Sequence, residues 1–325
     1  MRRREFLGLV GWAAAWPSAT HAQQAAIPII GYLSGLSETQ AALQLSAFRR
    51  GLSEFGFVES RTVAMEFRWA DGQFDKLPAM AADLVRRPVN LILAQTPQAA
   101  LAAKAATTVI PIVFVVGFDP VAGGLVTSLA RPGGNITGLS LQLTDMAGKR
   151  LGLLCELISK SPVVAMIVDP ASPNSAPEIK DAQAAAQALG VRLKMFNAAT
   201  PAELDTSFAA ITRERPDGLL VGAEPFLVNR RTELVALANR LGIPAAYPQR
   251  EYVDAGGLIS YGTNVAHSYR QAGIYAGRIL KGDKSTDLPV MRSTAFELVI
   301  NMRAAKTLGL TVPNSMQLLA DEVIE

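Results

Sequence analysis

The chain has 325 residues, of which 50% are apolar and 18% are charged, a composition that excludes a disordered or fibrous protein and suits about two domains. Lysine and arginine number 31 against 28 acidic residues, so the charge is too balanced for a protein that binds nucleic acid as a polyelectrolyte. Of the two histidines, only His267 follows the first 22 residues, which excludes a metal site built on two histidines there. The single cysteine, Cys155, cannot form an internal disulfide and is interpreted as a small buried residue on a helix.

Residues 1–22 have the parts of an export signal. The arginines Arg2–Arg4 precede a short apolar stretch, and the small residues Thr20 and Ala22 suit a signal peptidase site. The apolar stretch is too short to span a bilayer, which takes about 20 apolar residues. The arginines also resemble the twin-arginine consensus, and the choice between the Sec and twin-arginine pathways stays open. We expect a periplasmic mature chain that starts at Gln23 and has no stable membrane insertion.

From residue 27 onward, short β-branched runs alternate with longer amphipathic, Ala-rich stretches, which is typical of βα units on a parallel sheet. The first series has predicted strands at 27–33, 62–69, 89–94, 110–116 and 136–140, and helices at 38–55, 76–86 and 97–107. The second series has predicted strands at 163–168, 191–196, 218–222 and 243–247, and helices at 176–189, 202–215 and 229–241. Because the strands are almost continuously apolar, both faces of each sheet must be covered. The pattern predicts an α/β protein of two doubly wound lobes.

The C-terminal part does not continue this count. It holds predicted strands at 258–261 and 297–301 and helices at 268–280 and 302–308. These pieces are too few to form a domain, so they must complete the two lobes. We therefore expect the chain to cross between the lobes more than once.

Ligands of open parallel sheets bind beyond the carboxyl ends of the strands, where loops and helix N-termini converge. The residues that follow the predicted strands are hydroxyls, amides, carboxylates and aromatic rings: Ser34, Gln95 and Thr96, Asp119, the segment 169–175, Glu224, the segment 247–250 and the segment 261–264. Several of them, Ser34, Thr96, Asp119 and Asn174, are also good helix N-caps or turn residues. The two interpretations are compatible, since a helix N-terminus in a cleft serves both.

Motifs for catalysis are missing from the sequence. There is no phosphate-binding loop, no dinucleotide fingerprint and no nucleophile elbow. His267 is interpreted as a surface or capping residue. The carboxylates of Asp119, Asp169 and Glu224 would serve as acid and base only at a proximity that sequence does not establish. We predict neither enzyme activity, nor a metal, nor a cofactor.

Several strings resemble one family over essentially the whole chain after the export signal. They are Ala94–Ala100, Ile110–Val121, Gly124–Val126, Arg131–Gly138 and Leu298–Asn301. These strings resemble the substrate-binding proteins of ABC transporters of the tryptophan/tyrosine-binding type. The resemblance implies a type I periplasmic binding protein fold, with two lobes joined by three crossings and the ligand between them. It places residues 27–142 and 263–284 in the first lobe and residues 143–262 and 285–325 in the second.

The resemblance also implies a small ligand, typically an aromatic amino acid, and delivery to an ABC permease and its ATPase in the inner membrane. Nine candidate ligand-binding residues follow from position: Ser34, Thr96, Asp119, Ser172, Asn174, Ser175, Glu224, Tyr247 and Tyr261. Helix N-termini with Ser172, Asn174 and Ser175 suit the carboxylate of an amino acid, and Asp119 or Glu224 suits its ammonium. A tyrosine among Tyr32, Tyr247 and Tyr261 would stack on a flat side chain. The lipoprotein cysteine of many binding proteins is missing, and loops vary in this group, so the identity of the ligand does not transfer.

Two other functions stay open at this point. One is a sensory module that reports the ligand to a membrane receptor. The other is a hydrolase or lyase on the same scaffold, which would turn the ligand over.

Overall fold

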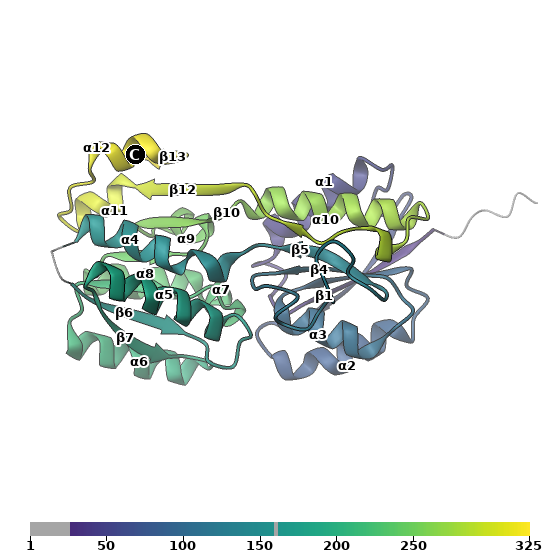
Figure 1. Cartoon of the computed structure of the whole chain (residues 1–325), viewed down its shortest axis with the longest axis horizontal. Helices are drawn as coiled ribbons and strands as arrows, with labels where there is room; N and C mark the ends of the chain where they lie inside the picture. The colour runs from purple at the N-terminus through teal and green to yellow at the C-terminus, as the bar shows by residue number, and fades with distance from the viewer. Residues whose placement is uncertain (1–26, 159–161) are drawn as a thin grey trace, which may run out of the picture.

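The computed structural model describes residues 27–158 and 162–325, so the predicted export signal lies outside the described residues. The chain forms two α/β lobes that lie side by side along the long axis of the molecule (Figure 1). Each lobe is built on one sheet whose strands are parallel, except that the C-terminal strand β12 of the second sheet runs antiparallel to its neighbour β10. The predicted fold class is confirmed.

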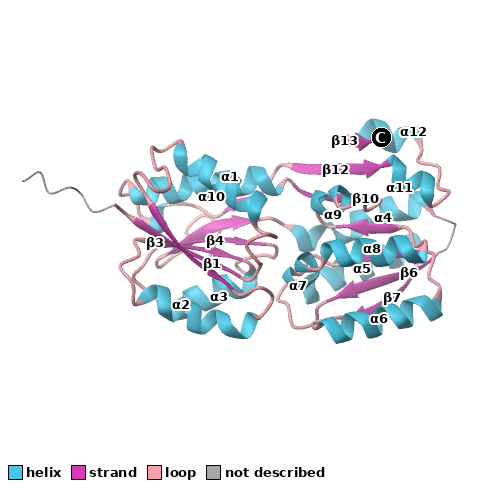
Figure 2. Cartoon of the chain, turned by 180° about the vertical axis from the view of Figure 1, so that it is seen from behind, coloured by secondary structure: helices cyan, strands magenta, loops and turns pink. Residues whose placement is uncertain are grey.

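Lobe 1 is the part of the chain built on a six-stranded sheet of order β11-β5-β4-β3-β1-β2. Its strands are β1 (Ile29–Ser34), β2 (Ala64–Trp69), β3 (Leu91–Gln95), β4 (Ile112–Val116), β5 (Ile136–Ser140) and β11 (Met291–Arg292). Its helices are α1 (Ala42–Ser53), α2 (Leu77–Val85), α3 (Pro97–Ala106) and α10 (Val265–Leu280), with 3-10 turns η1 (Phe74–Lys76) and η3 (Ser285–Asp287). In Figure 2, α1 and α10 cover one face of this sheet and α2 and α3 cover the other.

Lobe 2 is the part built on a seven-stranded sheet of order β13-β12-β10-β9-β8-β6-β7. Its strands are β6 (Val163–Val168), β7 (Arg192–Asn197), β8 (Gly218–Val221), β9 (Ala245–Tyr247), β10 (Ile259–Thr263), β12 (Phe296–Asn301) and β13 (Glu322–Ile324). Its helices are α4 (Ala147–Leu157), α5 (Ser175–Leu189), α6 (Pro201–Glu214), α7 (Pro225–Asn229), α8 (Arg231–Leu241), α9 (Arg250–Asp254), α11 (Met302–Thr307) and α12 (Asn314–Leu319), with the 3-10 turn η2 (Leu143–Met146) between the lobes. One face packs on α4 and α5 and the other on α6 and α8.

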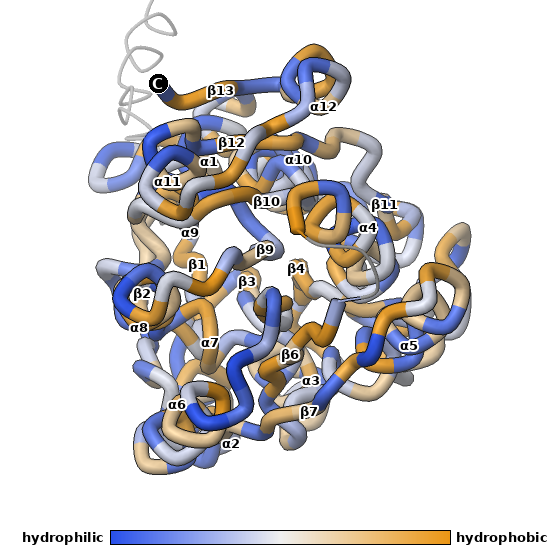
Figure 3. Tube along the Cα trace, turned by 90° about the vertical axis from the view of Figure 1, so that its left-hand side faces the viewer, coloured by the Kyte–Doolittle hydropathy of each residue, from blue (hydrophilic) through white to orange (hydrophobic). Residues whose placement is uncertain are grey.

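The central strands are buried on both sides, as their apolar sequences require. β3 and β4 have no exposed residue, and the hydrophobic segments in Figure 3 run through the interior along strands such as β4 and β6. Apolar burial of this kind is the main stabilising contribution, at about 25 cal/mol per Å².

The return of α10 to lobe 1 depends on two glycines. A Cβ at Gly273 would lie 2.1 Å from the carbonyl oxygen of Phe48, and one at Gly51 would lie 1.9 Å from that of Arg270. Because neither position carries a side chain, the backbones of α1 and α10 touch. α10 therefore packs on the sheet of lobe 1.

The chain crosses between the lobes three times, after β5, after β10 and after β11. The third crossing differs from the sequence-based division, which placed residues 285–325 in lobe 2. Met291 and Arg292 pair with β5 of lobe 1, and the side chain of Thr137 donates a hydrogen bond of 2.7 Å to the carbonyl oxygen of Leu288. The chain therefore leaves lobe 1 only after β11, a two-residue strand too short to give a sequence signal.

Other differences are local. The helix predicted from residue 38 begins at Ala42, and the helix predicted over 229–241 is α8, which begins at Arg231. The short helix α7 before it was not predicted. The short elements β13, α9 and α12 were not predicted, because three to six residues carry too little periodicity.

Candidate functional site

A cavity of about 50 Å³ lies between the lobes, beyond the carboxyl ends of strands from both sheets. Lobe 1 contributes Leu36, Gln44, Gln95, Thr96, Pro97, Val115, Gly117, Leu141, Val265 and Tyr269, and lobe 2 contributes Asn174, Ala223, Pro225, Val228 and Gln249, with Leu143 on the connecting turn. This is the place where open parallel sheets bind ligands.

The two lobes are in contact around the cavity. The side chain of Asn229 in lobe 2 accepts a hydrogen bond from the N–H of Ser37 (3.3 Å) and donates one to the carbonyl oxygen of Gly35 (3.3 Å). The side chain of Gln40 donates to the backbone oxygen of Asn229 (3.2 Å), and Leu36 packs into the core of lobe 2. Ligand sites of drug-sized molecules measure about 300–1,000 Å³. A molecule of amino-acid size therefore enters this cavity only when the lobes move apart.

On the lobe 1 side, Gln95 ends β3 with its side-chain amide held in one orientation. The buried hydroxyl of Tyr32 donates a hydrogen bond to Oε1 of Gln95, which leaves the amide nitrogen as the donor group of this side chain. The hydroxyl of Tyr269 on α10 lies within hydrogen-bonding reach of this amide. Burial raises the pKa of both tyrosines, so both hydroxyls are neutral.

Thr96 follows Gln95 and caps α3. Its hydroxyl accepts a hydrogen bond of 3.4 Å from the N–H of Ala99. Its φ of 93° is strained for a β-branched residue, and strain of this kind clusters at functional sites. The hydroxyl of Ser34 instead accepts from the N–H of Leu36 at 3.0 Å and shapes the neighbouring loop.

On the lobe 2 side, Asn174 presents an acceptor. Its Nδ2 donates a hydrogen bond of 2.8 Å to the carbonyl oxygen of Ala223, while its Oδ1 is buried and finds no partner within the described residues. Ser172 supports it, because the Ser172 hydroxyl accepts the N–H of Asn174 at 3.3 Å. The hydroxyl of Ser175 is buried and likewise has no partner in the described part of the chain. Buried polar atoms are rarely left unpaired, so these atoms indicate a place for a ligand or water.

Glu224 lies directly behind this wall, between Ala223 and Pro225, which both line the cavity. Its side chain is fully buried, and neither carboxyl oxygen accepts a hydrogen bond from any described residue. Burial raises the pKa of this carboxyl well above its usual range, with repulsion by Glu178 adding to the shift. The backbone N–H groups of Glu224 and Asp169 oppose the shift without the alignment of a hydrogen bond.

Arg150 and Glu178 form a fully buried ion pair beside Glu224. The guanidinium also donates to the carbonyl oxygen of Leu143 at 3.3 Å, on the first crossing between the lobes. The second oxygen of Glu178 accepts the N–H of Ala223 at 2.9 Å. This pair therefore connects α4, α5 and the wall of the cavity.

Three of the nine candidate residues are not brought to the cavity. The carboxylate of Asp119 accepts the N–H of Val121 at 2.8 Å and closes the turn after β4. Tyr247 is buried in the core of lobe 2, stacked on Tyr252 with ring centroids 4.9 Å apart. Tyr261 packs on Phe296 at 6.4 Å.

Thr96 and Asn174 line the cavity, and Ser34, Ser172, Ser175 and Glu224 lie next to residues that line it. The nine candidates do not include Gln95, Gln249 or Tyr269, although all three line the cavity. Gln95 had a signal, since it ends a strand. Tyr269 had no sequence signal, because only the return of α10 to lobe 1 brings it to the cavity.

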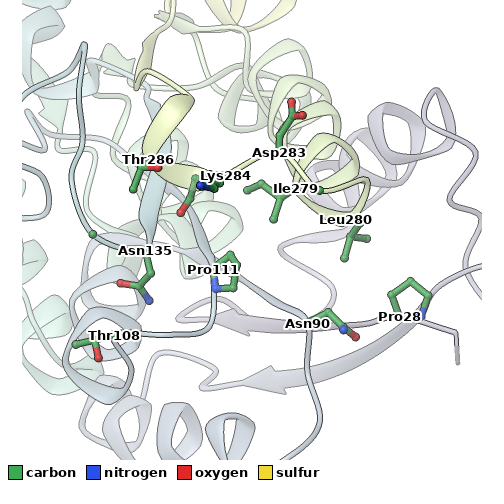
Figure 4. A pocket seen from close by; sticks show the side chains of 13 residues that line it. Pro28, Asn90, Thr108, Pro111, Asn135, Ile279, Leu280, Asp283, Lys284 and Thr286 are labelled. Carbon is green, nitrogen blue, oxygen red and sulfur yellow. The ribbon is translucent and has the colours of Figure 1, made fainter.

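A larger depression of about 480 Å³ lies at the opposite, amino ends of the lobe 1 strands (Figure 4). Its wall comes from lobe 1 alone. Asn90 and Asn135 in this wall hold the backbone: Asn90 accepts the N–H of Ile29 at 2.8 Å, and Asn135 donates to the carbonyl oxygen of Ile110 at 2.6 Å. The cavity between the lobes is therefore the candidate site.

Within residues 27–158 and 162–325, no helix is long and apolar enough to cross a membrane. The same part of the chain holds no group of three His, Cys, Asp or Glu side chains that could bind a metal ion.

Two doubly wound lobes, three crossings and a cavity between the lobes define the type I periplasmic binding proteins, and solved structures with this architecture are similar over most of the chain. The L-Trp complex of an ABC domain from Streptococcus pneumoniae has a TM-score of 0.82 and 24% identity, covering 91% of this chain and 99% of that one. A conserved domain protein from Vibrio cholerae has a TM-score of 0.84 and 23% identity, with the same coverage. The ligand-free, open structure of a substrate-binding protein from Clostridium difficile has a TM-score of 0.64 and 23% identity, covering 92% of this chain and 99% of that one.

The chain belongs to the family of ABC transporter substrate-binding proteins, whose model matches residues 29–324. A tyrosine-binding protein from Clostridioides difficile is 26% identical over 278 residues, which covers 85% of this chain and 80% of the relative. The members of this family are substrate-binding proteins. The chain is therefore a binding protein and not an enzyme.

Proposed function

We propose that the protein captures an amino acid between its two lobes outside the cytoplasm and delivers it to an ABC permease and its ATPase. The observation that carries this proposal is the pair of polar groups on opposite walls of the cavity, Gln95 of lobe 1 and Asn174 of lobe 2. Each amide is fixed by a hydrogen bond within its own lobe. The relatives that bind tyrosine and L-Trp support an amino acid as the ligand.

Capture requires that the lobes open and close. A ligand that prefers the closed form shifts this equilibrium, and a shift from about 1:99 to 99:1 takes roughly 5.5 kcal/mol of preference. Contacts such as those of Asn229 with Gly35 and Ser37 favour closure. The permease would recognise the closed form.

The proposed ligand set keeps the candidates at or beside the cavity: Ser34, Thr96, Ser172, Asn174, Ser175 and Glu224, together with Gln95 and Tyr269. Asp119, Tyr247 and Tyr261 are left out, because their side chains are engaged elsewhere.

The binding experiment uses the chain from Gln23 onward. Trp69, which packs against core residues of both lobes, is then its single tryptophan, since the other two are Trp12 and Trp16. A thermal-shift screen against the twenty amino acids should find a compound that, at about 100 times its Kd, adds about 2.7 kcal/mol of stability. The same compound should change the fluorescence of Trp69 as the lobes close. If a folded sample responds to none of the twenty, the proposal of an amino-acid ligand is wrong.

Export is a separate part of the proposal, because the segment with Arg2–Arg4 lies outside the described residues. Fractionation of cells that express the full chain should place a processed protein, beginning at Gln23, in the periplasm. The double variant Arg3→Lys, Arg4→Lys should stay in the cytoplasm if export uses the twin-arginine pathway. Unchanged export of the double variant would favour the Sec pathway, and an unprocessed cytoplasmic wild-type chain would contradict the signal.

A further inference from the structure

The two walls of the cavity differ in charge, and the difference begins at their helices. In lobe 1, α1, α3 and α10 all supply residues to the cavity from their N-terminal halves. None of the three has an acidic residue in its first turn. The first turn of a helix carries a partial positive charge of about half an elementary charge, so this wall is positive.

In lobe 2, each helix that starts at the cavity brings a glutamate to its start: Glu178 on α5, Glu224 before α7 and Glu251 on α9. The carboxyl oxygens of Glu224 and Glu251 are buried and without a hydrogen-bond partner among the residues that the structure describes. The positive end of α5 is already neutralised by its own Glu178, so it offers little to an anion.

The cations of lobe 2 do not balance these carboxyls. Arg150 is buried and is committed to Glu178. Arg231 lies near Glu251, half-buried, with its guanidinium donating to the carbonyl oxygen of Val228 at 3.4 Å. Among the described residues, the charged groups that act on Glu224 are the carboxyls of Glu178 and Asp169, and no cation forms an ion pair with Glu224 itself. The ionised form of Glu224 therefore has no counter-charge in the described part of this wall, and a buried charge without a partner is costly.

Asn174 also offers an acceptor atom to a ligand, at the surface of the cavity. Its Nδ2 is used by Ala223, so the atom left for a ligand is the acceptor Oδ1. On the opposite wall, the hydroxyl of Tyr32 occupies Oε1 of Gln95, so this amide offers a ligand only its donor Nε2, which lies near the Tyr269 hydroxyl. A ligand that satisfies both walls has its donor end at lobe 2 and its acceptor end at lobe 1.

We infer that the cavity selects ligands with a protonated amine, that Asn174 of lobe 2 receives this amine with the Glu224 carboxyl behind the wall as its counter-charge, and that Gln95 with the start of α3 receives the anionic end. This inference rests on the proposed function and names its substrate class and the direction of the ligand. It reverses the sequence-based assignment of the carboxylate to Ser172, Asn174 and Ser175.

Binding of an amine at this cavity should depend on pH. The groups that face Glu224 are Glu178 with its partner Arg150, Asp169, and the hydroxyl of Tyr252 on α9. An arriving ammonium favours the ionised carboxyl, so the pKa of Glu224 is lower in the complex than in the free protein. Affinity for an amine should therefore rise with pH until the free carboxyl is ionised, and binding below that point should release a proton.

The test compares ligands that share one side chain and differ in their charged ends. The probes are three sets: L-tyrosine with tyramine and 3-(4-hydroxyphenyl)propionate, L-tryptophan with tryptamine and indole-3-propionate, and L-leucine with isopentylamine and 4-methylpentanoate. Titration calorimetry at pH 7 measures each Kd for the wild-type chain from Gln23, for Glu224→Gln and for Asn174→Leu. Glu233→Gln, a glutamate on the exposed face of α8, is the matched control.

In the set that binds, loss of the amine should cost at least 100-fold in affinity for the wild-type chain. Glu224→Gln should weaken binding of the amino acid at least tenfold and binding of the deaminated acid less than twofold. Glu233→Gln should change neither affinity. Calorimetry in two buffers of different ionisation enthalpy should show proton release for the wild type and none for Glu224→Gln. Circular dichroism confirms that each variant is folded.

The two proposals can fail separately. If an amino acid and its deaminated acid bind equally well, the inference is wrong and the proposed function stands. If the amines bind but no amino acid does, the inference stands and the proposed function is wrong. If Glu224→Gln weakens binding of the amino acid and of the deaminated acid alike, the carboxyl is structural and the inference is overturned. Binding of the deaminated acids alone also overturns the inference. A folded chain that binds none of these probes contradicts both.

Discussion

The two lobes share one architecture, a covered parallel sheet whose loops meet at the cavity, but they prepare that cavity in opposite ways. Lobe 1 brings helix starts without acids and an amide donor held by Tyr32. Lobe 2 brings three buried glutamates and an amide acceptor at Asn174. Repeating a fold fixes where the loops meet, while the few residues after each strand decide which charge they offer.

The buried ion pair is the most sensitive point of lobe 2. Arg150→Met leaves Glu178 as a buried carboxyl without its cation and should lower the free energy of unfolding by about 3–5 kcal/mol. Urea titration followed by circular dichroism measures the loss. Adding Glu178→Gln, which keeps an acceptor for the N–H of Ala223, should recover most of the stability. If the double variant is as unstable as the single one, the pair does not act through charge.

Gly117 tests whether the two walls must touch. A Cβ at this position of lobe 1 would lie 2.9 Å from Nδ2 of Asn174 in lobe 2, so Gly117→Ala should hinder closure and weaken binding about tenfold, or about 1.4 kcal/mol. Titration calorimetry measures the affinity, and X-ray scattering follows the distance between the lobes. Gly152→Ala is the control, since a Cβ there meets no atom within 4 Å. Equal affinity in both variants would show that this contact is not part of the bound form.

Glu224 sets a pH dependence in lobe 2 without counterpart in the cavity wall of lobe 1. The pKa of Glu224 is raised in the folded state. The folded state therefore keeps a proton that the unfolded state loses near the ordinary pKa of glutamate, about 4.3. The stability it contributes is therefore complete below that pH and is lost as pH rises to the pKa of the folded state.

Relative to Glu224→Gln, the wild-type chain should become less stable with rising pH, by at most about 1.4 kcal/mol per pH unit. Denaturant titrations of both proteins between pH 4 and pH 8, at about one-unit steps, measure the difference. A difference that stays constant with pH would mean that Glu224 is not held protonated.

The smallest expected effect concerns the rim of the cavity. Asn229→Ala removes hydrogen bonds to Gly35 and Ser37 and should weaken ligand binding by about 1 kcal/mol, or roughly fivefold, through the closed form. Calorimetry measures the affinity, and the fluorescence of Trp69 compares the arrangement of the lobes in the two chains without ligand. Asn239→Ala, which removes a hydrogen bond to Gly256 within lobe 2, should leave affinity unchanged. A larger loss from Asn239→Ala than from Asn229→Ala would contradict a role for the rim.

The fold could largely be read from the sequence because strands such as 112–116 and 163–168 are apolar throughout and the helices between them are amphipathic. The two-residue strand β11 could not, since its membership in lobe 1 depends on pairing with β5 across the chain. The site was predictable in part for a similar reason. Thr96 and Asn174 follow strands directly, whereas Tyr269 lies on a helix that returns from the other lobe.

The sequence by itself determined two covered parallel sheets and the loops that line the space between them, because periodicity and turn residues are local properties of the chain. Only the tertiary structure decided which polar atoms are already used. Tyr32 occupies one side of Gln95, Ala223 occupies one side of Asn174, and the buried carboxyl of Glu224 has no hydrogen-bond partner among the described residues. Hydrogen-bond partners distant in sequence set these outcomes, and they give the cavity its direction.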